Sequence, residues 1–348
     1  MSEWETDHSS TRLQDCKTAR PYDYILKIYL PYILLFRIFI KVNKVFIVKR
    51  MTGIPFTSLM LAGITGCFSI TDKPQQTKEQ MPPKTEKIIV SPTGYNLSSP
   101  DRIIKLPTAL REISGITFTD SKTLACVQDE NGLIFLVDIE KGEMKSYFSF
   151  NSNGDYEGIA YTGTNIYVLK SNGNIYQVSF SGSSGRTRKI LKADIDEADF
   201  EGLCFDRKNN RLLLVPKNNP LEDSDSKNRH PGYSLDLKTE AVTLSPVLYF
   251  DRKAIKEFAK KNDIEDADFK PSAISIHPVT GDLFVLSASS RMLFIFSPGG
   301  TIRHIEKLDR DIFNMPEGLA FLPGGDMFVS NEGGENTPTI LRFNFIRK

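Results

Sequence analysis

Residues 155–161 read DYEGIAY, and residues 199–205 read DFEGLCF. Both phrases place an acid, an aromatic residue and a second acid before a glycine and a short apolar run. Looser copies of the phrase occur at 112–118, 270–276 and 315–321. The residues at the glycine position, called the anchors below, are Gly115, Gly158, Gly202, Ala273 and Gly318, with spacings of 43, 44, 71 and 45 residues. A phrase that recurs at a nearly fixed period indicates a repeat architecture.

A turn and further β-rich runs follow each anchor phrase. The runs are short, rich in Val, Ile, Leu, Phe and Tyr, and separated by glycine-containing turns, which is typical of antiparallel strands. Second runs lie at 123–130, 165–172, 211–218, 282–289 and 326–333, third runs at 133–139, 175–180, 292–297 and 340–345, and fourth runs at 143–150, 241–250 and 301–308. Four strands per repeat of this length are typical of a propeller blade. We therefore expect an all-β fold, a five-bladed β-propeller with four-stranded antiparallel blades.

Two irregularities in the repeat need their own explanation. The last repeat ends after its third strand, so we expect the N-terminal strand RIIKLP (102–107) to complete it and close the ring. The 71-residue gap contains a polar loop at 218–232 and a helical pattern at 251–262 with Asp251 as its N-cap, which predicts one helical insertion. A β-sandwich with coincidental spacing is the alternative fold.

The residues before 101 do not belong to the repeats. Residues 51–67 follow Lys49 and Arg50, carry no charge and end at Cys67, as expected for a lipoprotein signal peptide in which Cys67 is the lipidation site. An uncleaved anchor helix is the alternative, but Pro55 and the short apolar core disfavour it. Residues 68–100 are a Pro-rich tether, and 101–348 form the propeller. We interpret residues 1–50 as a mis-assigned start or a poorly ordered leader.

Composition and cysteine usage set broad limits on function. The chain is 40% hydrophobic and 25% charged with a net charge of +1, so nothing indicates nucleic acid as a partner. We expect a monomer that is held to a membrane of the bacterial cell envelope, inner or outer, by a lipid anchor, with an unknown protein or small molecule as its ligand. Cys126 and Cys204 lie in expected strands of different blades, which favours buried free thiols over a disulfide.

The acidic residues of the anchor phrases are the candidate site. If these strands are the innermost of each blade, Glu157, Glu201 and Glu317 converge on one mouth of the central channel, and Ser114 and Ser272 hold the same position in the other two blades. Carboxylates of like charge that lie close together repel one another unless something compensates. Calcium, which accepts irregular oxygen ligands, would do so, whereas capping of backbone N–H groups or pairing with Lys or Arg is the alternative. Further candidate ligands are Asp155, Asp199, Asp129 and Glu332.

The residues directly before the five anchors are, in order, Ser, Glu, Glu, Ser and Glu. This order of phrases resembles that of the SdiA-regulated family, and so do the stretches FEGLCF, FVLSASSR and PEGLAF. These are bacterial envelope propellers, distantly similar to NHL-repeat proteins. The resemblance spans residues 101–348 and implies a five-bladed propeller with a calcium site, often preceded by a membrane-targeting segment. Of the candidate ligands, it carries over Glu157, Glu201 and Glu317. The family's biochemical activity is not established.

Two functional hypotheses remain open at this stage. The first is a non-catalytic envelope lipoprotein whose propeller binds a ligand or partner, since the chain lacks Walker, HExxH, CxxC and GxSxG motifs. The second is a calcium-dependent hydrolase of the lactonase or phosphotriesterase type, with the metal in the channel. No histidine is expected near the mouth, because His277 lies roughly 17 Å away along its strand. An aspartate such as Asp155 or Asp199 would have to act as the base.

Overall fold

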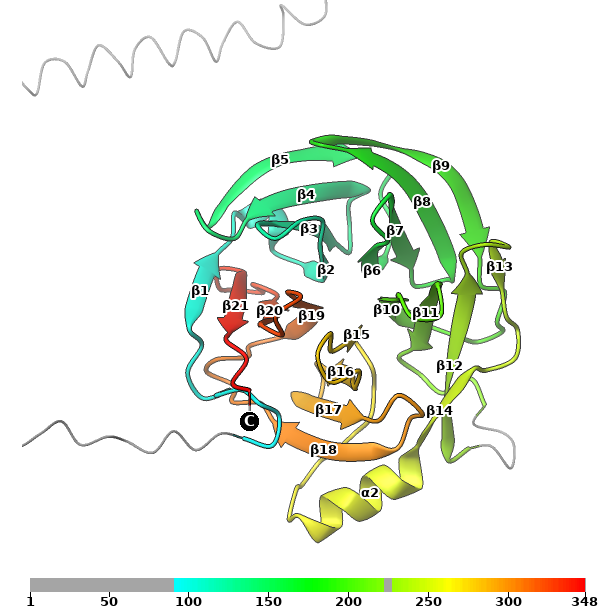
Figure 1. Cartoon of the computed structure of the whole chain (residues 1–348), viewed down its shortest axis with the longest axis vertical. Helices are drawn as coiled ribbons and strands as arrows, with labels where there is room; N and C mark the ends of the chain where they lie inside the picture. Colours follow the sequence, from blue (N-terminus) through cyan, green and yellow to red (C-terminus); the bar gives the residue numbers. More distant parts are fainter. Residues whose placement is uncertain (1–90, 222–226, 348) are drawn as a thin grey trace, which may run out of the picture. The chain divides into compact units, whose positions relative to one another are not determined.

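The computed structural model describes residues 91–221 and 227–347, and these residues build five antiparallel sheets around a central axis (Figure 1). The first blade consists of β2 (Ile113–Phe118), β3 (Thr123–Gln128), β4 (Leu133–Asp138) and β5 (Glu143–Ser149), and the second of β6 (Tyr156–Tyr161), β7 (Asn165–Lys170), β8 (Asn174–Ser181) and β9 (Ser184–Lys192). The third blade consists of β10 (Phe200–Asp206), β11 (Arg211–Pro216), β12 (Arg229–Asp236), β13 (Ala241–Val242) and β14 (Leu248–Asp251). The fourth blade consists of β15 (Ala273–Ile276), β16 (Leu283–Ser287), β17 (Met292–Phe296) and β18 (Ile302–Lys307). The all-β, five-bladed propeller expected from the repeats is confirmed.

The fifth blade joins the two ends of the propeller. Its own strands are β19 (Pro316–Phe321), β20 (Met327–Asn331) and β21 (Thr339–Phe343). The fourth, outermost strand is β1 (Arg102–Lys105), which runs antiparallel to β21 with Ile104 opposite Ile340. The predicted closure by an N-terminal strand is therefore confirmed, and it pairs an edge of β21 that would otherwise be open.

The anchor residues allow the inner strands to approach one another. The strands β2, β6, β10, β15 and β19 contact each other in turn around the axis. A methyl group added to Gly158 would lie 2.7 Å from Leu203 Cβ, and one added to Gly115 or Gly318 would lie 3.2 Å from a backbone nitrogen of the next inner strand. Glycine recurs in the anchor phrase because a side chain at this position would push neighbouring blades apart.

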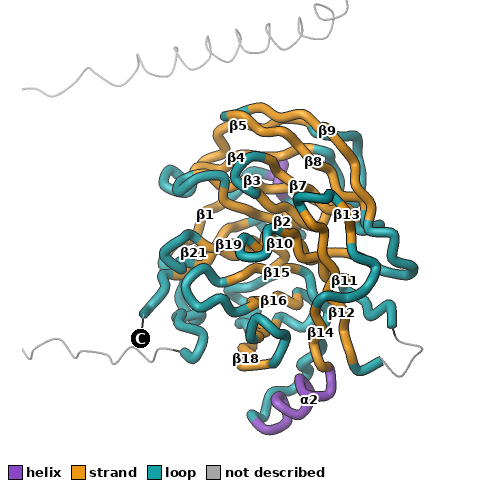
Figure 2. Tube along the Cα trace, turned by 45° about the vertical axis from the view of Figure 1, so that its right-hand side comes forward, coloured by secondary structure: helices purple, strands orange, loops and turns teal. Residues whose placement is uncertain are grey.

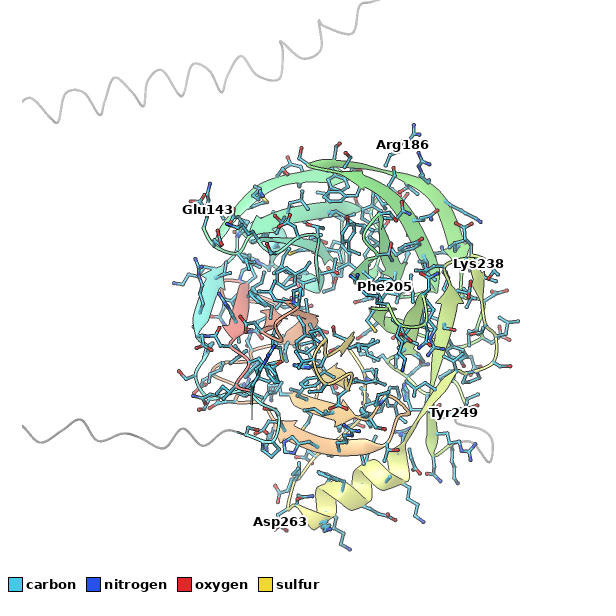
Figure 3. The ribbon with its side chains drawn as sticks, viewed as in Figure 1. Glu143, Arg186, Phe205, Lys238, Tyr249 and Asp263 are labelled. Atoms are coloured by element: carbon cyan, nitrogen blue, oxygen red, sulfur yellow. The ribbon has the colours of Figure 1, made fainter. Side chains whose placement is uncertain are left out.

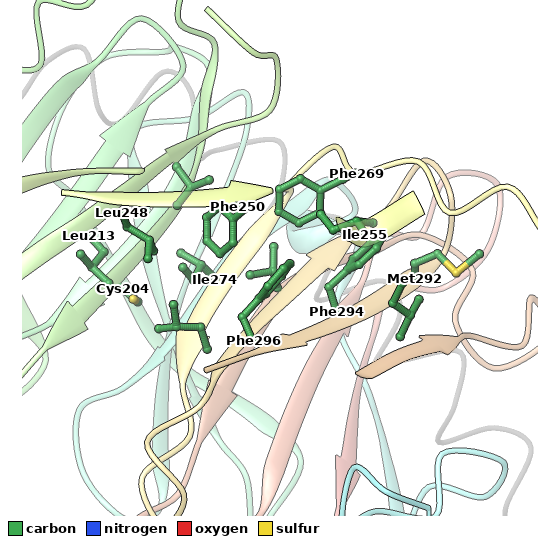
Figure 4. Packing of buried hydrophobic residues seen from close by; sticks show 14 of the residues in the cluster. Cys204, Leu213, Leu248, Phe250, Ile255, Phe269, Ile274, Met292, Phe294 and Phe296 are labelled. Atoms are coloured by element: carbon green, nitrogen blue, oxygen red, sulfur yellow. The ribbon is translucent and has the colours of Figure 1, made fainter. Parts of the chain in front are cut away.

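The hydrophobic core consists of five clusters, and each cluster fills the space between two neighbouring blades. The cluster between the third and fourth blades, shown in Figure 4, joins Leu213 and Phe250 on one side to Phe294 and Phe296 on the other. Phe250 and Phe296 are in direct ring contact, with centroids 4.6 Å apart. Each blade buries both faces only because it has a neighbour on each side, so the ring is stabilised as a whole.

The third blade carries the insertion and differs most from expectation. Its third strand, β12, begins at Arg229 inside the segment predicted as a polar loop. The sequence pattern did not predict this strand because it contains Pro231 and Gly232, which are unfavourable in strands. The expected fourth strand is divided into β13 and β14, which both pair with β12. The helix α2 (Arg252–Lys261) follows β14 and packs beside β18, outside the ring (Figures 1 and 2). As predicted, Asp251 caps this helix by accepting hydrogen bonds from the amides of Lys253 and Ala254, at 2.9 and 3.0 Å.

The last residues of the predicted tether pack against the propeller. Tyr95 is fully buried, and its hydroxyl donates a hydrogen bond to the carbonyl of Gly325 in the fifth blade. Leu97 belongs to the same hydrophobic cluster as Phe343. The folded unit therefore begins before Asp101, where the sequence pattern had placed its boundary.

Segments that precede residue 91 carry several of the predictions. The leader at 1–50, the signal peptide at 51–67 with Cys67, and residues 68–90 of the tether lie outside the described residues. Within the part of the chain that is described, no helix has the length and apolar character needed to cross a membrane. Cys126 and Cys204 are buried free thiols, as expected.

Candidate functional site

A β-bulge sits immediately before the anchor in four of the five inner strands. The pairing register shifts between Ile113 and Gly115 in β2, and at the corresponding places in β6, β10 and β19. The extra residues are Ser114, Glu157, Glu201 and Glu317, while Ser272 in the fourth blade lies just before β15 begins. A bulged residue has no partner in the ladder, and its side chain is directed differently from those of a regular strand. The candidate glutamates are therefore placed by a local irregularity that repeats around the ring.

The three bulge glutamates lie within electrostatic reach of one another. Burial, together with the neighbouring charges of Glu201, Asp155 and Glu317, raises the pKa of Glu157 to about 9. Burial together with Glu201 and Glu332 raises the pKa of Glu317 to about 8. Acids that are more than 100 residues apart in the chain thus affect one another's ionisation, because the ring brings their blades together.

Two more candidate acids follow second strands at the same mouth. Burial, with Glu112 and Asp129 nearby, raises the pKa of Glu332 to about 7. Burial and Glu112 raise the pKa of Asp129 to about 6. The sequence analysis missed Glu112, although it occupies the position in its phrase that Asp155 and Asp199 hold in theirs. The name acidic mouth is used below for the set Glu112, Asp129, Asp155, Glu157, Asp199, Glu201, Glu317 and Glu332.

The outer aspartates are more exposed than the glutamates. Asp155 and Asp199 precede β6 and β10, and both side chains are exposed. The hydroxyl of Ser171 donates a hydrogen bond to Asp155, and burial of part of the Asp199 carboxyl raises its pKa. These two residues form the rim of the acidic mouth, with the bulge glutamates beneath them.

A lysine that the sequence analysis did not single out lies among these acids. The ammonium group of Lys217 forms an ion pair with Glu201, which counters part of the effect of burial and leaves the pKa of Glu201 at about 7. Lys217 directly follows β11, and its amide donates to the carbonyl of Asp199 at 2.7 Å. The amides of Asp129 and Glu332 donate in the same way to Glu112 and Met315, so the three residues are structurally equivalent. The sequence itself shows this equivalence, since Asp129, Lys217 and Glu332 each occupy the seventh position of their second runs.

The two serines at the bulge position hold blades together. The Ser114 hydroxyl donates to the carbonyl of Tyr156 in the next blade at 2.5 Å. The Ser272 hydroxyl donates to the carbonyl of Pro316, also in the next blade, at 3.4 Å. Where serine replaces glutamate, the position therefore serves a structural hydrogen bond between blades.

The donor atoms of the acidic mouth suit a hard cation such as calcium, the metal that the family resemblance implies. They are carboxylate oxygens, and the Oδ1 atom of Asp129 is buried without a hydrogen-bond partner. Among the described residues, however, no three His, Cys, Asp or Glu side chains form a group that could hold a metal ion as they stand. The chemistry of the site fits a cation, and side chains from separate blades would have to draw together around it.

The histidines within the described residues lie elsewhere. The Tyr95 hydroxyl donates to Gly325, so the Nε2 atom of His277 donates to that hydroxyl at 2.8 Å and its Nδ1 accepts from the amide of Thr280 at 3.0 Å. Burial lowers the pKa of His277 to about 4. His230 bonds to the carbonyl of Pro216 and His304 to Glu306. These three histidines are structural, and none contributes to the acidic mouth.

The fold and this site define a class of protein: a five-bladed β-propeller with carboxylates from several blades at one end of its channel. The chain belongs to the SdiA-regulated family, whose model matches residues 95–334. A search of curated proteins finds no significant match.

Solved structures with a similar fold are distant in sequence. The glutaminyl cyclase of Myxococcus xanthus is 14% identical, with a TM-score of 0.48 over 71% of this chain and 95% of the other. A chain of a nidogen/laminin complex is 13% identical, with a TM-score of 0.41 over 63% and 72%. A streptogramin B lyase is 12% identical, with a TM-score of 0.39 over 67% and 66%. These likenesses concern the fold and say nothing about the activity of this chain.

Proposed function

We propose that this propeller is a binding module whose acidic mouth takes up a hard cation, calcium in the first instance. The observation that carries the proposal is the crowding of eight carboxyl groups from four blades, with burial and mutual repulsion raising the pKa values of Glu157 and Glu317 to about 9 and 8. The repulsion within a group of buried carboxylates can be removed by protonation or by a bound cation. The raised pKa values of Glu157 and Glu317 describe protonation, which occurs where no cation is bound.

The bulge glutamates would supply most of the charge for such a cation. Glu157, Glu201 and Glu317 lie deepest, and Asp129 and Glu332 offer further oxygens beside them. Calcium tolerates irregular sets of six to eight oxygen ligands, including water, better than magnesium does. Because a bound cation would displace protons from these carboxyls, calcium affinity should rise with pH.

The test is the melting temperature of the purified full chain at pH 8 with calcium, with magnesium and with a chelator. We expect calcium to raise the melting temperature more than magnesium, and Glu157→Gln to remove most of that difference. Metal analysis of the dialysed protein gives the stoichiometry directly. Glu143→Gln is the matched control, because Glu143 is an exposed glutamate on the outer strand β5 (Figure 3). Equal melting temperatures with calcium and chelator would contradict the proposal.

A calcium-dependent hydrolase of the lactonase or phosphotriesterase type is the second candidate. It is favoured by the pKa values of Glu201 and Glu332, which are raised to about 7, since general acid–base catalysis works best with a group that titrates near the working pH. Assays with lactones and phosphotriesters, with calcium and with chelator, separate the two candidates. Chelator-sensitive turnover that is lost in Glu157→Gln would establish the enzyme, and a melting shift without turnover would establish the binding module.

We also propose that the propeller is a monomer tethered to a membrane of the bacterial cell envelope through a lipid on Cys67. The support is the order of an apolar segment, a cysteine, a Pro-rich stretch and a folded unit along the chain. Detergent partitioning of the wild type and of Cys67→Ser tests the anchor: the wild type should enter the detergent phase and the variant should stay in the aqueous phase. Size-exclusion chromatography of the variant tests the monomer.

A further inference from the structure

The end of the channel opposite the acidic mouth holds a cavity of about 1030 Å³. Most of its lining comes from the last residues of all five inner strands and from the turns that follow them. The volume lies just above the usual range for small-molecule sites, which is about 300–1,000 Å³. The function proposed above makes no use of this cavity.

A ring of five apolar side chains lies between the cavity and the acidic mouth. Each blade contributes the residue directly after its anchor, and all five are at most 6% exposed: Ile116, Ile159, Leu203, Ile274 and Leu319. Ile159, Leu203 and Ile274 each lie against the anchor glycine of the preceding blade. The ring keeps low-dielectric material beneath the carboxylates, and it forms an apolar floor for the cavity.

Two residues further along each strand, the side chains are again large and apolar, but here they are half-buried. They are Phe118, Tyr161, Phe205, Ile276 and Phe321, and all five line the cavity. These five side chains come from equivalent positions around one cavity, and the apolar surface that they contribute remains partly open to solvent. Such a surface favours an apolar occupant, because burying it removes apolar area from water.

Three of the four aromatic side chains in this set are held in place by a ring contact or a hydrogen bond. Phe118 packs edge-on against Phe328, with centroids 5.0 Å apart, and Phe321 against Phe284 at 5.2 Å. The Tyr161 hydroxyl donates to the carbonyl of Gly163 at 2.7 Å. The walls are thus fixed before a ligand arrives, which lowers the entropic cost of binding.

The charged residues at the cavity favour an anion. Asp206 is neutralised by Arg211, whose Nε atom donates to its carboxylate at 2.9 Å. Arg207 stacks on the ring of Phe205 with 5.7 Å between the guanidinium carbon and the ring centroid. Among the described residues, neither Arg207 nor Lys208 forms an ion pair, and both line the cavity opposite a single remaining acid, Asp120. Phe205 lies on the inner side of its blade (Figure 3).

We propose that this cavity binds a small molecule with an aromatic or aliphatic body and one anionic group. The apolar body would lie against the five half-buried side chains and the ring beneath them. The anionic group would lie at the rim, where Arg207 and Lys208 supply two positive charges without partners of their own. Binding here does not depend on the acidic mouth, because the apolar ring separates the two ends of the channel.

Two fluorescent probes test the proposal on the full chain. Anilinonaphthalene sulfonate carries an anionic group, and phenylnaphthylamine has the same ring system without it. We expect saturable binding of both probes at one site per chain, with the sulfonate bound at least about fivefold more tightly. Equal affinities for the two probes, or a failure of the folded chain to bind either one saturably, would overturn the proposal.

Variants locate the site and assign the charge. Replacing both cations in the double variant Arg207→Gln, Lys208→Gln should remove the preference for the sulfonate and leave phenylnaphthylamine binding unchanged. Phe205→Ala should weaken both probes, and Ile276→Ala serves the same purpose should the first variant fold poorly. Tyr147→Ala, which removes a 59% exposed ring on the outer strand β5, should change neither. Probe binding that is weakened in Tyr147→Ala, and is unchanged in Phe205→Ala and Ile276→Ala, contradicts this location.

The binding of the two probes tests the cavity independently of the proposed cation site. We expect both probes to bind with unchanged affinity in chelator and in Glu157→Gln. Loss of probe binding in Glu157→Gln would show that the two ends of the channel form one site, and the separate cavity would then be wrong.

Discussion

The ammonium group of Lys217 is ion-paired with the carboxylate of Glu201, and both residues belong to the third blade of the ring. The Glu201 side chain is only 7% exposed, whereas that of Lys217 is 43% exposed. Lys217 also lowers the pKa values of Glu317 and Glu332 in the fifth blade. The ammonium group of this one lysine therefore offsets the charge of acids that come from different blades.

Replacing that lysine should have two opposite effects. In chelator at pH 8, Lys217→Gln should destabilise the propeller by roughly 1–2 kcal/mol, since a mostly buried carboxylate loses its partner. With calcium present, the increase in melting temperature should be larger than in the wild type, because the lysine no longer competes. Lys122→Gln, which breaks an exposed ion pair with Glu140, is the control and should have neither effect. A variant that loses stability without gaining calcium response would contradict competition at one site.

The stability of the propeller in chelator should fall as the pH rises from about 5 to 9. The pKa of Glu157 is raised by burial to about 9 and that of Glu317 to about 8, whereas unfolded carboxyls titrate near 4.5. The folded state then holds more protons than the unfolded state, so raising the pH favours unfolding until the folded values are passed. Thermal melts at several pH values measure the slope, and Glu157→Gln should flatten it. A slope of opposite sign would refute the placement of these acids.

The close approach of the inner strands can be tested at one anchor. Gly158→Ala should destabilise the propeller by roughly 1–3 kcal/mol, because the new methyl group would lie 2.7 Å from Leu203 Cβ and 3.1 Å from the Glu201 carbonyl. Gly324→Ala is the control, since a methyl group there meets nothing within 4 Å. Urea unfolding of both variants gives the comparison. Similar midpoints for the two would mean that the anchor glycine is not required for packing between blades.

The cap of the inserted helix offers a fourth test. Asp251→Ala should cost about 1 kcal/mol, since the amides of Lys253 and Ala254 lose their acceptor. For a domain of this size, the melting temperature should fall by roughly 2–4 °C. Asp251→Ser, which keeps an acceptor at the N-cap, should recover most of the loss. If the serine variant is as unstable as the alanine variant, the hydrogen bonds of the cap are not the cause.

The fold was largely accessible from the sequence because a propeller repeats one local pattern. The five anchors, the turns and the β-rich runs predicted the number of blades, and the strand at 102–107 predicted the closure. The third strand of the third blade was missed, because Pro231 and Gly232 interrupt the alternation, and the pairing of these two residues with β14 overrides that local preference. The segment around Tyr95 was missed as part of the folded unit, since its burial depends on contacts with residues more than 180 positions away.

The candidate site was accessible only in part. The repeat placed Glu157, Glu201 and Glu317 at one position, but the bulges that direct them and the ion pair with Lys217 came from the structure. Glu112 was overlooked although its phrase position matches that of Asp155. The apolar cavity at the other end of the channel was not foreseen, because half-buried apolar residues at strand ends are indistinguishable in sequence from core residues.

The amino-acid sequence by itself determined the repeat, and with it the blades, their number and the order in which acids and serines occur around the ring. These properties are local, since each anchor phrase and its turns specify one blade. The tertiary structure alone decided how deeply the acids are buried, which of them face Lys217, and that the two ends of the channel differ in character. Burial and charge interactions depend on which blades meet across the axis, and closure of the ring creates those distances.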